Sequence, residues 1–374
     1  MRNSRQAWAW LGLVVVSVAL LIDIWRPRDR PGIDFHTYYA AATVGLQHGW
    51  GHVYDQALIA SVQKQLVPAE LSQPFLSPPT VAWLVAPLTL LPYWAALSVW
   101  TVFTLGSFAA ALGWSAANGG VIRWIAVLAT LAPWWVMHAV SLGQVVPLVA
   151  AGVVVGWRLL RDDRDVAAGI ALSVIFLKPN TAVLVPLALL VAGRYRAVAS
   201  WLAVGGAFAV IAFLLMGVQG ISAYVSELRA PLPIGADALT LHGAMDLSGV
   251  AALALRLLIV GVVLATSFKL RSSPGMVVPL AVVGSLLTSP YLHASDLCLL
   301  SAAAWIVWEE RPATAWRVAL PAAWVVASPY LWYTTHSPGL NRWPWIELIF
   351  LGAVGLMAWR PLTGAADLRT RAPA

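Results

Sequence analysis

The sequence predicts an all-α, polytopic membrane protein. Of its 374 residues, 60% are hydrophobic and only 10% are charged, whereas soluble domains carry about 25% charged residues. Hydrophobic runs recur from Trp8 to Trp359 with few polar breaks, a pattern typical of helices that cross a bilayer. Many of the 21 tryptophans flank these runs, where indole rings favour the headgroup layer.

The basic residues give a net charge of +7, but they lie in short clusters between the hydrophobic runs. This arrangement argues against a nucleic-acid partner and instead follows the enrichment of Lys and Arg in cytoplasmic loops. Alternation of these clusters with outer segments gives about 12 crossings with both termini in the cytoplasm. The clusters assigned to the cytoplasm are Arg2/Arg5, Arg123, Arg158/Arg161/Arg164, Arg194/Arg196, Lys269/Arg271, Arg311/Arg317 and Arg360/Arg369/Arg371.

The crossings are expected to form a single domain, residues 1–360, followed by a short cytoplasmic tail, 361–374. No small-residue cleavage site follows the first hydrophobic run, so it is expected to remain as an uncleaved span. A large outer loop, 26–79, comes next. The expected spans are 7–25, 80–115, 121–138, 144–160, 165–177, 180–193, 198–217, 250–267, 275–290, 297–310, 318–333 and 345–359.

Two of these stretches allow more than one interpretation. The stretch 80–115 is too long for one straight helix and contains Pro87 and Pro92, so it is one kinked span or a span plus a re-entrant piece. The stretch 165–193 has basic flanks at both ends and Lys178 near its middle, which predicts two short half-helices that meet at the outer side. Such broken helices are tolerated at membrane depth where they line a cavity or pack inside protein.

The polar motifs of the outer side begin with Asp34, in the stretch DFHTYYAAA. An aspartate before an apolar run is a good helix N-cap, and Tyr38 and Tyr39 would then be interface aromatics. However, a loop of about 50 residues without structure of its own is uncommon unless it is functional. The stretch therefore has a structural and a functional interpretation.

Lys178 is the most unusual charge in the sequence because a lysine in a hydrophobic segment is costly unless it is paired or solvated. Pro179 frees backbone groups beside it, and Asn180 can use them. The lysine either snorkels to an interface or provides a cation for an anionic group, most plausibly a phosphate.

Three further positions complete the set. His293 and Asp296 are three residues apart and would share one helix face, either as a structural contact or as part of a site. Gln144 begins a span at the outer side and is either a cap or a site residue, and Arg256 falls within a predicted span. The single Cys298 allows no intrachain disulfide, and no metal-ligand set is recognisable, so neither a metal nor a cofactor is expected.

The order of these motifs resembles the multispanning glycosyltransferases of the C superfamily, and within it family 87. That group includes the polyprenyl-phosphate-mannose-dependent alpha-mannosyltransferases of actinobacterial glycolipid assembly. The resemblance covers roughly residues 30–300. Its motifs are Asp34-x-x-x-Tyr38-Tyr39-Ala40-Ala41, then Gly51 with Tyr54-Asp55, Phe75-x-Ser77-Pro78-Pro79, Leu91-Pro92, Gly143-Gln144, Lys178-Pro179, and Ser289-Pro290-Tyr291-x-His293-x-x-Asp296-Leu297.

The resemblance implies an inverting sugar transfer at the outer face of a bacterial plasma membrane. The donor would be a polyprenyl-phosphate sugar, with mannose as the family's best-known case, and the acceptor a glycolipid or glycan. It implies that Asp34 is the catalytic aspartate and that His293 is the nearest candidate for a second catalytic group. Residues expected to bind the donor phosphate or substrate, or to line the pocket, are Lys178, Asn180, Tyr38, Tyr39, Gln144, Asp296 and Arg256.

Two other functions remain open from the sequence. A lipid-linked glycan transporter or flippase would carry polar residues through the full membrane depth and a weak inverted repeat, whereas the polar groups here gather at one side and no repeat is visible. A noncatalytic scaffold is the third alternative. The inner loops contain no phosphate-cradling glycine loop, which argues against direct use of a soluble nucleotide.

Overall fold

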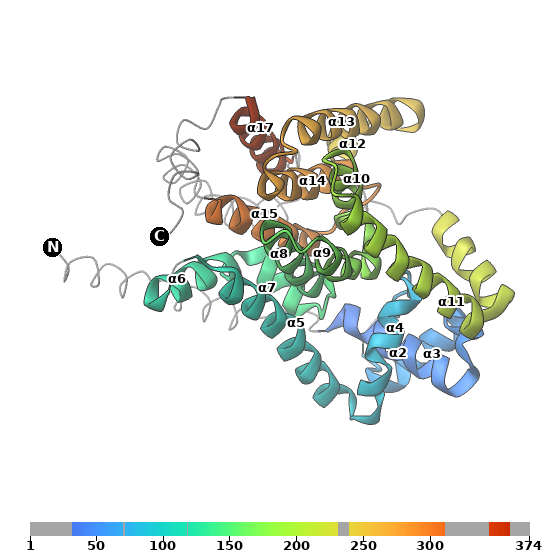
Figure 1. Ribbon diagram of the computed structural model, residues 1–374. Helices are drawn as coiled ribbons and strands as arrows, with labels where there is room; N and C mark the ends of the chain where they lie inside the picture. The colour runs from blue at the N-terminus through green and yellow to red at the C-terminus, as the bar shows by residue number, and fades with distance from the viewer. Residues whose placement is uncertain (1–31, 70–71, 118, 231–238, 311–343, 360–374) are drawn as a thin grey trace.

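The structure is a computed structural model that describes residues 32–69, 72–117, 119–230, 239–310 and 344–359. Within these ranges every regular element is a helix and no strand occurs (Figure 1). The expected all-α class is therefore confirmed. The expected spans 7–25 and 318–333 and the tail 361–374 lie outside the described residues.

The described part of the expected outer loop 26–79 is largely helical. It contains α2 (Ile33–His48), the 3₁₀ turn η1 (Trp50–His52) and α3 (Gln56–Leu66). Gly49, with a φ of 91°, lets the chain turn after α2, and the Asp55 carboxylate begins α3 by accepting the N–H groups of Ala57 and Leu58, each at 3.1 Å. Local capping thus gives this segment its own structure.

The stretch 80–115 is divided rather than continuous. A short segment of α4 (Pro79–Val85) and η2 (Ala86–Leu90) precedes the long helix α5 (Tyr93–Ser115). Leu91 is extended, with φ −101° and ψ 151°, because Pro92 disfavours a helical residue before it. The sequence allowed one kinked span or a span plus a separate piece, and the structure has a long helix preceded by a separate short segment.

The next segments meet at sharp breaks. Helices α6 (Gly120–Leu131) and α7 (Trp134–Ser141) are bent by 69°, where Pro133 interrupts the backbone hydrogen bonds. Helix α8 (Val146–Arg161) follows and is almost wholly buried. It occupies the middle of the bundle beside α9 (Asp165–Leu172) (Figure 1).

The predicted break at Lys178 is confirmed. Helix α9 continues into η3 (Ser173–Leu177), and after Lys178 the chain forms η4 (Pro179–Thr181) and α10 (Leu184–Val191). Lys178 itself is extended, with φ −152° and ψ 78°. Glycines in α8 allow α9 and η3 to pack closely against it. A Cβ added at Gly152 would lie 2.2 Å from Val174, and one at Gly156 would lie 2.6 Å from Leu172.

The remaining helices complete the bundle. Helix α11 (Tyr195–Arg229) is kinked at Gly217, whose φ is 61°, so the segment 218–229 forms a second helical arm. The others are α12 (Leu241–Ala244), α13 (Gly249–Lys269), α14 (Pro274–Thr288), η5 (Ala294–Leu297), α15 (Cys298–Glu309) and α17 (Trp345–Trp359).

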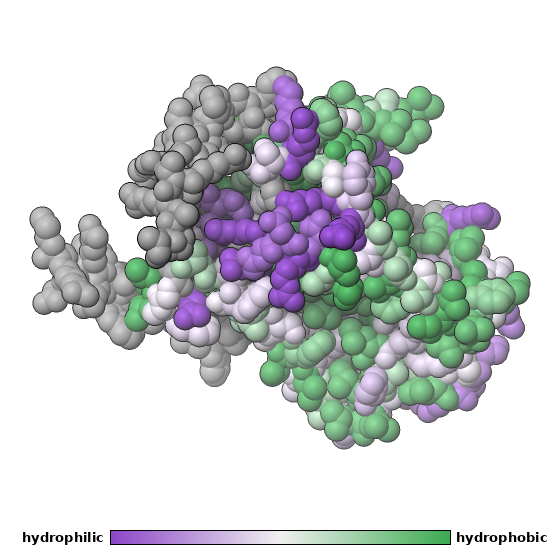
Figure 2. Space-filling view, viewed as in Figure 1, coloured by the Kyte–Doolittle hydropathy of each residue, from purple (hydrophilic) through white to green (hydrophobic). Residues whose placement is uncertain are grey.

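Among the described residues, three helices are long and apolar enough to cross a membrane: α5, α11 and α13. A fourth is possible if the bent pair α6–α7 counts as one span. Twelve crossings are not confirmed, because several expected spans are short or broken helices packed inside the bundle. Figure 2 shows hydrophilic side chains gathered where Figure 1 labels α8 and α9, with hydrophobic side chains spread over α11.

Candidate active site

The first turn of α2 is fixed by the loop that precedes α8. The Asp34 N–H donates to the Leu142 carbonyl at 2.9 Å. Gly143 has a φ of +70°, and a Cβ there would lie 2.5 Å from Phe35 Cβ, so both its conformation and its surroundings require glycine. Trp100 Nε1 holds the loop by donating to the Gly143 carbonyl at 2.8 Å. This packing brings the carboxylate of Asp34 beside the next residue of the loop.

That residue, Gln144, links three elements. Its Oε1 accepts hydrogen bonds from the Tyr38 hydroxyl and from Lys178 Nζ, each at 3.1 Å. Its side chain also hydrogen-bonds Asp34, and because Oε1 already accepts twice, the amide N–H is the group suited to donate to the carboxylate. Gln144, Tyr38 and Lys178 are all buried, which leaves them little freedom to move.

Lys178 also forms a buried ion pair with Asp296. Its Nζ lies 2.6 Å from Asp296 Oδ1, and the carboxylate is fully buried. The other oxygen, Oδ2, accepts the backbone N–H of His293 at 2.9 Å. The His293 residue is exposed, and its ring packs at a tilt against Tyr291 with centroids 5.8 Å apart. The pair thus joins the break in the α9–α10 hairpin to the segment before α15.

Asp34 is the second carboxylate of this cluster. Burial raises its pKa above the usual value of 3.8, while the charge of Lys178, the hydrogen bond from Gln144 and the charge of His293 oppose that rise. The negative charge of Asp296 raises the pKa further. A carboxylate with a raised pKa is a stronger base than an exposed aspartate, and here it lies close to a fixed cation.

The N-cap interpretation of Asp34 is wrong. The N-cap position of α2 is Gly32, which forms no side-chain cap, and Asp34 lies inside the first turn. The aspartate that does cap a helix in this segment is Asp55. The Asp34 side chain is therefore directed to the cluster instead of to the start of its own helix.

Three predicted site residues have hydrogen-bond partners outside this cluster. The Tyr39 hydroxyl donates to the Leu91 carbonyl at 2.9 Å, so it ties α2 to the turn before α5. Asn180 Nδ2 lies 3.4 Å from Ser289 Oγ, at the edge of the segment that carries His293. Arg256 Nη2 lies 2.9 Å from His242 Nε2, between α12 and α13. Tyr39 thus links α2 to the turn before α5, and Arg256 contacts His242.

Aromatic residues not predicted as site residues connect the cluster to α11. Tyr38 meets Phe75 edge-on, with centroids 6.3 Å apart, Phe75 stacks on Tyr54 at 5.4 Å, and Tyr54 stacks on Tyr224 at 4.9 Å. Tyr291 interacts electrostatically with Lys178. Tyr54, Phe75 and Tyr291 belong to the motifs of the family resemblance, and that position in the sequence could have identified them as site residues. Tyr224 had no such signal.

The arm 218–229 of α11 lies over this aromatic chain. Gly220 packs so closely on η1 that an added Cβ would lie 3.1 Å from Gly51 Cα. The opposite face of the arm lines a groove of about 510 Å³ with Phe213, Val218 and Arg229. The kink therefore directs one face of the arm toward the site, while the other face lines an open groove of mixed apolar and polar character.

The fold and the site define a helical membrane protein with a carboxylate, a buried lysine and a glutamine joined at the breaks between helices. Among the residues described, no group of three or more His, Cys, Asp or Glu side chains could hold a metal ion. The family model of glycosyltransferase family 87 matches residues 75–329. The chain belongs to glycosyltransferase family 87, and it is a glycosyltransferase.

The matched range includes Gln144, Lys178, His293 and Asp296, while Asp34 lies before it. No curated protein and no solved structure matches the chain. The role of Asp34 therefore depends on the geometry, which brings it to residues inside the matched range.

Proposed function

We propose that this glycosyltransferase moves a sugar, mannose in the first instance, from a polyprenyl-phosphate donor to a glycolipid or glycan acceptor. Asp34 is the general base, and the reaction takes place at the outer face of a bacterial plasma membrane, with both termini cytoplasmic. The proposal rests on the contact of Asp34 and Lys178 with Gln144. Gln144 precedes α8 and Lys178 follows η3, so the three residues meet at one end of the hairpin formed by α8 and α9.

The division of roles follows from an inverting displacement. The acceptor oxygen forms the new bond to the anomeric carbon as the bond from that carbon to the phosphate oxygen breaks. The proton of the acceptor hydroxyl passes to Asp34, whose raised pKa suits it to this task. The polyprenyl monophosphate leaves with the bonding electron pair and gains negative charge.

Lys178 is the cation best suited to stabilise that charge. A cationic group that is already fixed in place before the reaction need not reorganise as the charge develops. Lys178 is oriented in this way by Asp296 and Gln144. His293 is exposed, and its backbone N–H donates to the Asp296 carboxylate. It is a second group that can contact the substrate. Gln144 and Tyr38 position Asp34 and Lys178. No metal or other cofactor takes part in the proposed reaction.

The donor is expected to arrive from the membrane and not from the aqueous phase. The face of α11 before the kink exposes large apolar side chains, including Leu214, which is 74% exposed. Such a surface suits contact with lipid chains. A polyprenyl chain can therefore stay in the bilayer while its phosphate reaches the site between the helices.

A transporter fits the arrangement less well. It would need polar groups through the membrane depth, but α8 is lined by buried Val, Ala and Gly residues between Gln144 and its basic end. The polar cluster thus occupies one end of the hairpin, as an enzyme that acts at one face requires.

The proposal is tested with the full-length protein in proteoliposomes that contain a lipid acceptor. Polyprenyl-phosphate [¹⁴C]mannose is supplied as donor, and nucleotide-linked [¹⁴C]mannose is the control donor. Transfer of label to the acceptor from the lipid donor alone supports the proposal. Transfer only from the nucleotide sugar contradicts the donor class, and movement of the lipid across the bilayer without transfer supports the transporter.

A further inference from the structure

One face of the α11 arm carries polar side chains next to the active-site cluster. Gly220, Tyr224 and Glu227 are spaced by four and three residues, so they share a helix face. Gly220 packs on η1, where an added Cβ would lie 3.1 Å from Gly51 Cα. Tyr224 stacks on Tyr54 with ring centroids 4.9 Å apart. Glu227 therefore belongs to the face of the arm that packs on η1 and Tyr54.

The Glu227 carboxylate lies near the hydroxyl of Tyr54. Burial raises the pKa of Tyr54, and the neighbouring Tyr224 hydroxyl and Glu227 carboxylate raise it further, which requires the negative charge to be close. The Tyr54 hydroxyl itself donates to the Ser77 carbonyl at 2.7 Å, so it is already engaged. The carboxylate is thus placed beside the aromatic chain that leads from Tyr38 to α11.

Tyr291 connects this face of the arm to the buried ion pair. It interacts electrostatically with Tyr224 and with Lys178, so the arm and the cation both lie near it. Tyr224, Glu227 and Tyr291 are half-buried, and each keeps part of its side chain open. Two hydroxyls and one carboxylate therefore border the cluster on the side of the arm.

These three polar groups are unsatisfied among the residues that the structure describes. Within that part of the chain Glu227 forms no ion pair, and its carboxylate makes no hydrogen bond. The same holds for the hydroxyls of Tyr224 and Tyr291. A partly buried carboxylate is costly unless hydrogen-bond donors satisfy it, and those donors can come from a bound ligand.

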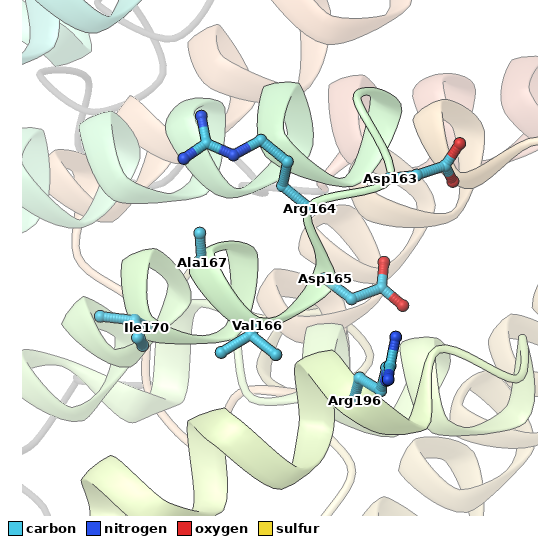
Figure 3. A pocket seen from close by; sticks show the side chains of 7 residues that line it. All are labelled: Asp163, Arg164, Asp165, Val166, Ala167, Ile170 and Arg196. Atoms are coloured by element: carbon cyan, nitrogen blue, oxygen red, sulfur yellow. The ribbon is translucent and has the colours of Figure 1, made fainter.

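The aspartates at the turn between α8 and α9 differ in this respect. Arg194 Nη1 lies 2.9 Å from Asp163 Oδ1 and 3.2 Å from Asp165 Oδ1. Figure 3 shows Arg196 beside Asp165 as well. Carboxylates at that end of the hairpin therefore have cationic neighbours, whereas Glu227 forms no such pair with any described residue.

We propose that Tyr224, Glu227 and Tyr291 bind the sugar of the acceptor and select a neutral, hydroxyl-rich group. This inference rests on the proposed function, in which an acceptor hydroxyl gives its proton to Asp34. The Glu227 carboxylate accepts hydrogen bonds from sugar hydroxyls, and the tyrosine hydroxyls can donate or accept. A carboxylate repels the phosphate of the donor, which the proposed function places at Lys178, so the sugar beside Glu227 belongs to the acceptor.

The test measures the kinetics of the full-length protein in proteoliposomes, with polyprenyl-phosphate mannose as donor and octyl α-mannoside as acceptor. Glu227→Gln keeps the shape of the side chain but removes its charge. KM for octyl α-mannoside should rise at least about tenfold, as expected for a lost hydrogen bond to a charged group. Tyr224→Phe keeps the ring on Tyr54 and should raise the same KM by a smaller factor. KM for the donor should stay at the wild-type value in both variants.

Arg229→Gln is the matched control. It removes a charge from the same arm, two residues away, but Arg229 lines the groove on the opposite face. Both KM values should match the wild type. An unchanged acceptor KM in Glu227→Gln, or a rise of the donor KM in its place, overturns the proposal. An equal rise of the acceptor KM in Arg229→Gln would indicate a disturbance of the whole arm and would contradict binding by Glu227.

A binding measurement separates this inference from the proposed function. Octyl α-mannoside and sugar-free polyprenyl phosphate are titrated separately onto the detergent-solubilised protein and followed by native mass spectrometry. Glu227→Gln should weaken octyl α-mannoside at least about tenfold and leave polyprenyl phosphate unchanged. If that result holds while the wild type transfers no sugar from the lipid donor, the proposed function fails and the sugar site stands. If transfer from the lipid donor occurs but Glu227→Gln binds octyl α-mannoside as the wild type does, the sugar site fails and the proposed function stands.

Discussion

Lys178 Nζ lies 2.6 Å from Asp296 Oδ1, and this buried ion pair joins two parts of the chain that are far apart in sequence. The lysine stands at the break between η3 and η4, and the aspartate in η5. The lysine also donates to Gln144 at 3.1 Å, so the pair fixes the cation beside Asp34.

Removal of the lysine alone is expected to destabilise the protein strongly. Lys178→Met leaves the fully buried Asp296 carboxylate without its partner, which typically costs about 3–5 kcal/mol. The double variant Lys178→Met/Asp296→Leu removes both charges and should recover most of that stability. Thermal unfolding in detergent measures the difference.

The same double variant separates stability from function. If Lys178 stabilises the leaving phosphate, sugar transfer should stay at least about 100-fold below wild type even though the fold is recovered. Substantial transfer by the stable double variant would show that another cation meets the phosphate.

Replacement of the proposed base tests the site directly. Asp34→Asn keeps the shape of the side chain but removes its basicity, and transfer should fall by about 10²–10⁴-fold. Asp55→Asn is the control, because it makes the same chemical change in the same segment at a residue that caps α3. Asparagine caps about as well as aspartate, so this variant should keep its activity.

The pH dependence of transfer should follow the pKa of Asp34. The base works only when it is deprotonated, so kcat/KM falls as the pH drops through its raised pKa. Gln144→Leu removes a hydrogen bond that lowers this pKa, and the acid limb should move to higher pH. Asp296→Asn removes a negative charge that raises it, and the limb should move to lower pH.

These opposite shifts distinguish Asp34 from other titrating groups. An acid limb that stays in place in both variants would mean that a different residue limits the reaction. A shift in the same direction in both variants would indicate a general disturbance of the site.

The loop at Gly143 should be intolerant of a side chain. Gly143→Ala places a methyl group 2.5 Å from Phe35 Cβ in a backbone conformation with positive φ, so the first turn of α2 must move away from the loop. Transfer should drop by about 100-fold, since small misplacements of catalytic groups are costly. Gly106→Ala is the control, because its Cβ would meet nothing within 4 Å, and it should leave transfer unchanged.

The sequence identified the members of the polar cluster more completely than the spans. Asp34, Gln144, Lys178, His293 and Asp296 were all named from polar residues at the ends of hydrophobic runs, and the structure brings them together. The break at Lys178 was also predicted, because a lysine followed by proline cannot continue a buried helix at low cost.

The count of spans could not be derived in the same way. Hydrophobicity reports that a segment avoids water, but it does not distinguish a lipid-facing helix from one buried in protein. Helix α8 is almost wholly buried, whereas the membrane-length window of α11 is 6% buried, although both are apolar in sequence. A helix at α2 was expected only under the capping interpretation of Asp34, and α3 was not expected, because the polar and small residues of the segment resemble those of a loop.

The sequence by itself determined the helical membrane class, the broken hairpin around Lys178 and the set of polar residues that form the cluster. Tertiary structure alone decided which of them meet. It directed Asp34 into the cluster instead of to a helix cap, and it gave Tyr39 and Arg256 other hydrogen-bond partners. The physical reason is that composition and periodicity fix local conformation, whereas close approaches such as that of Gly143 to Phe35 decide how helices far apart in the chain are joined.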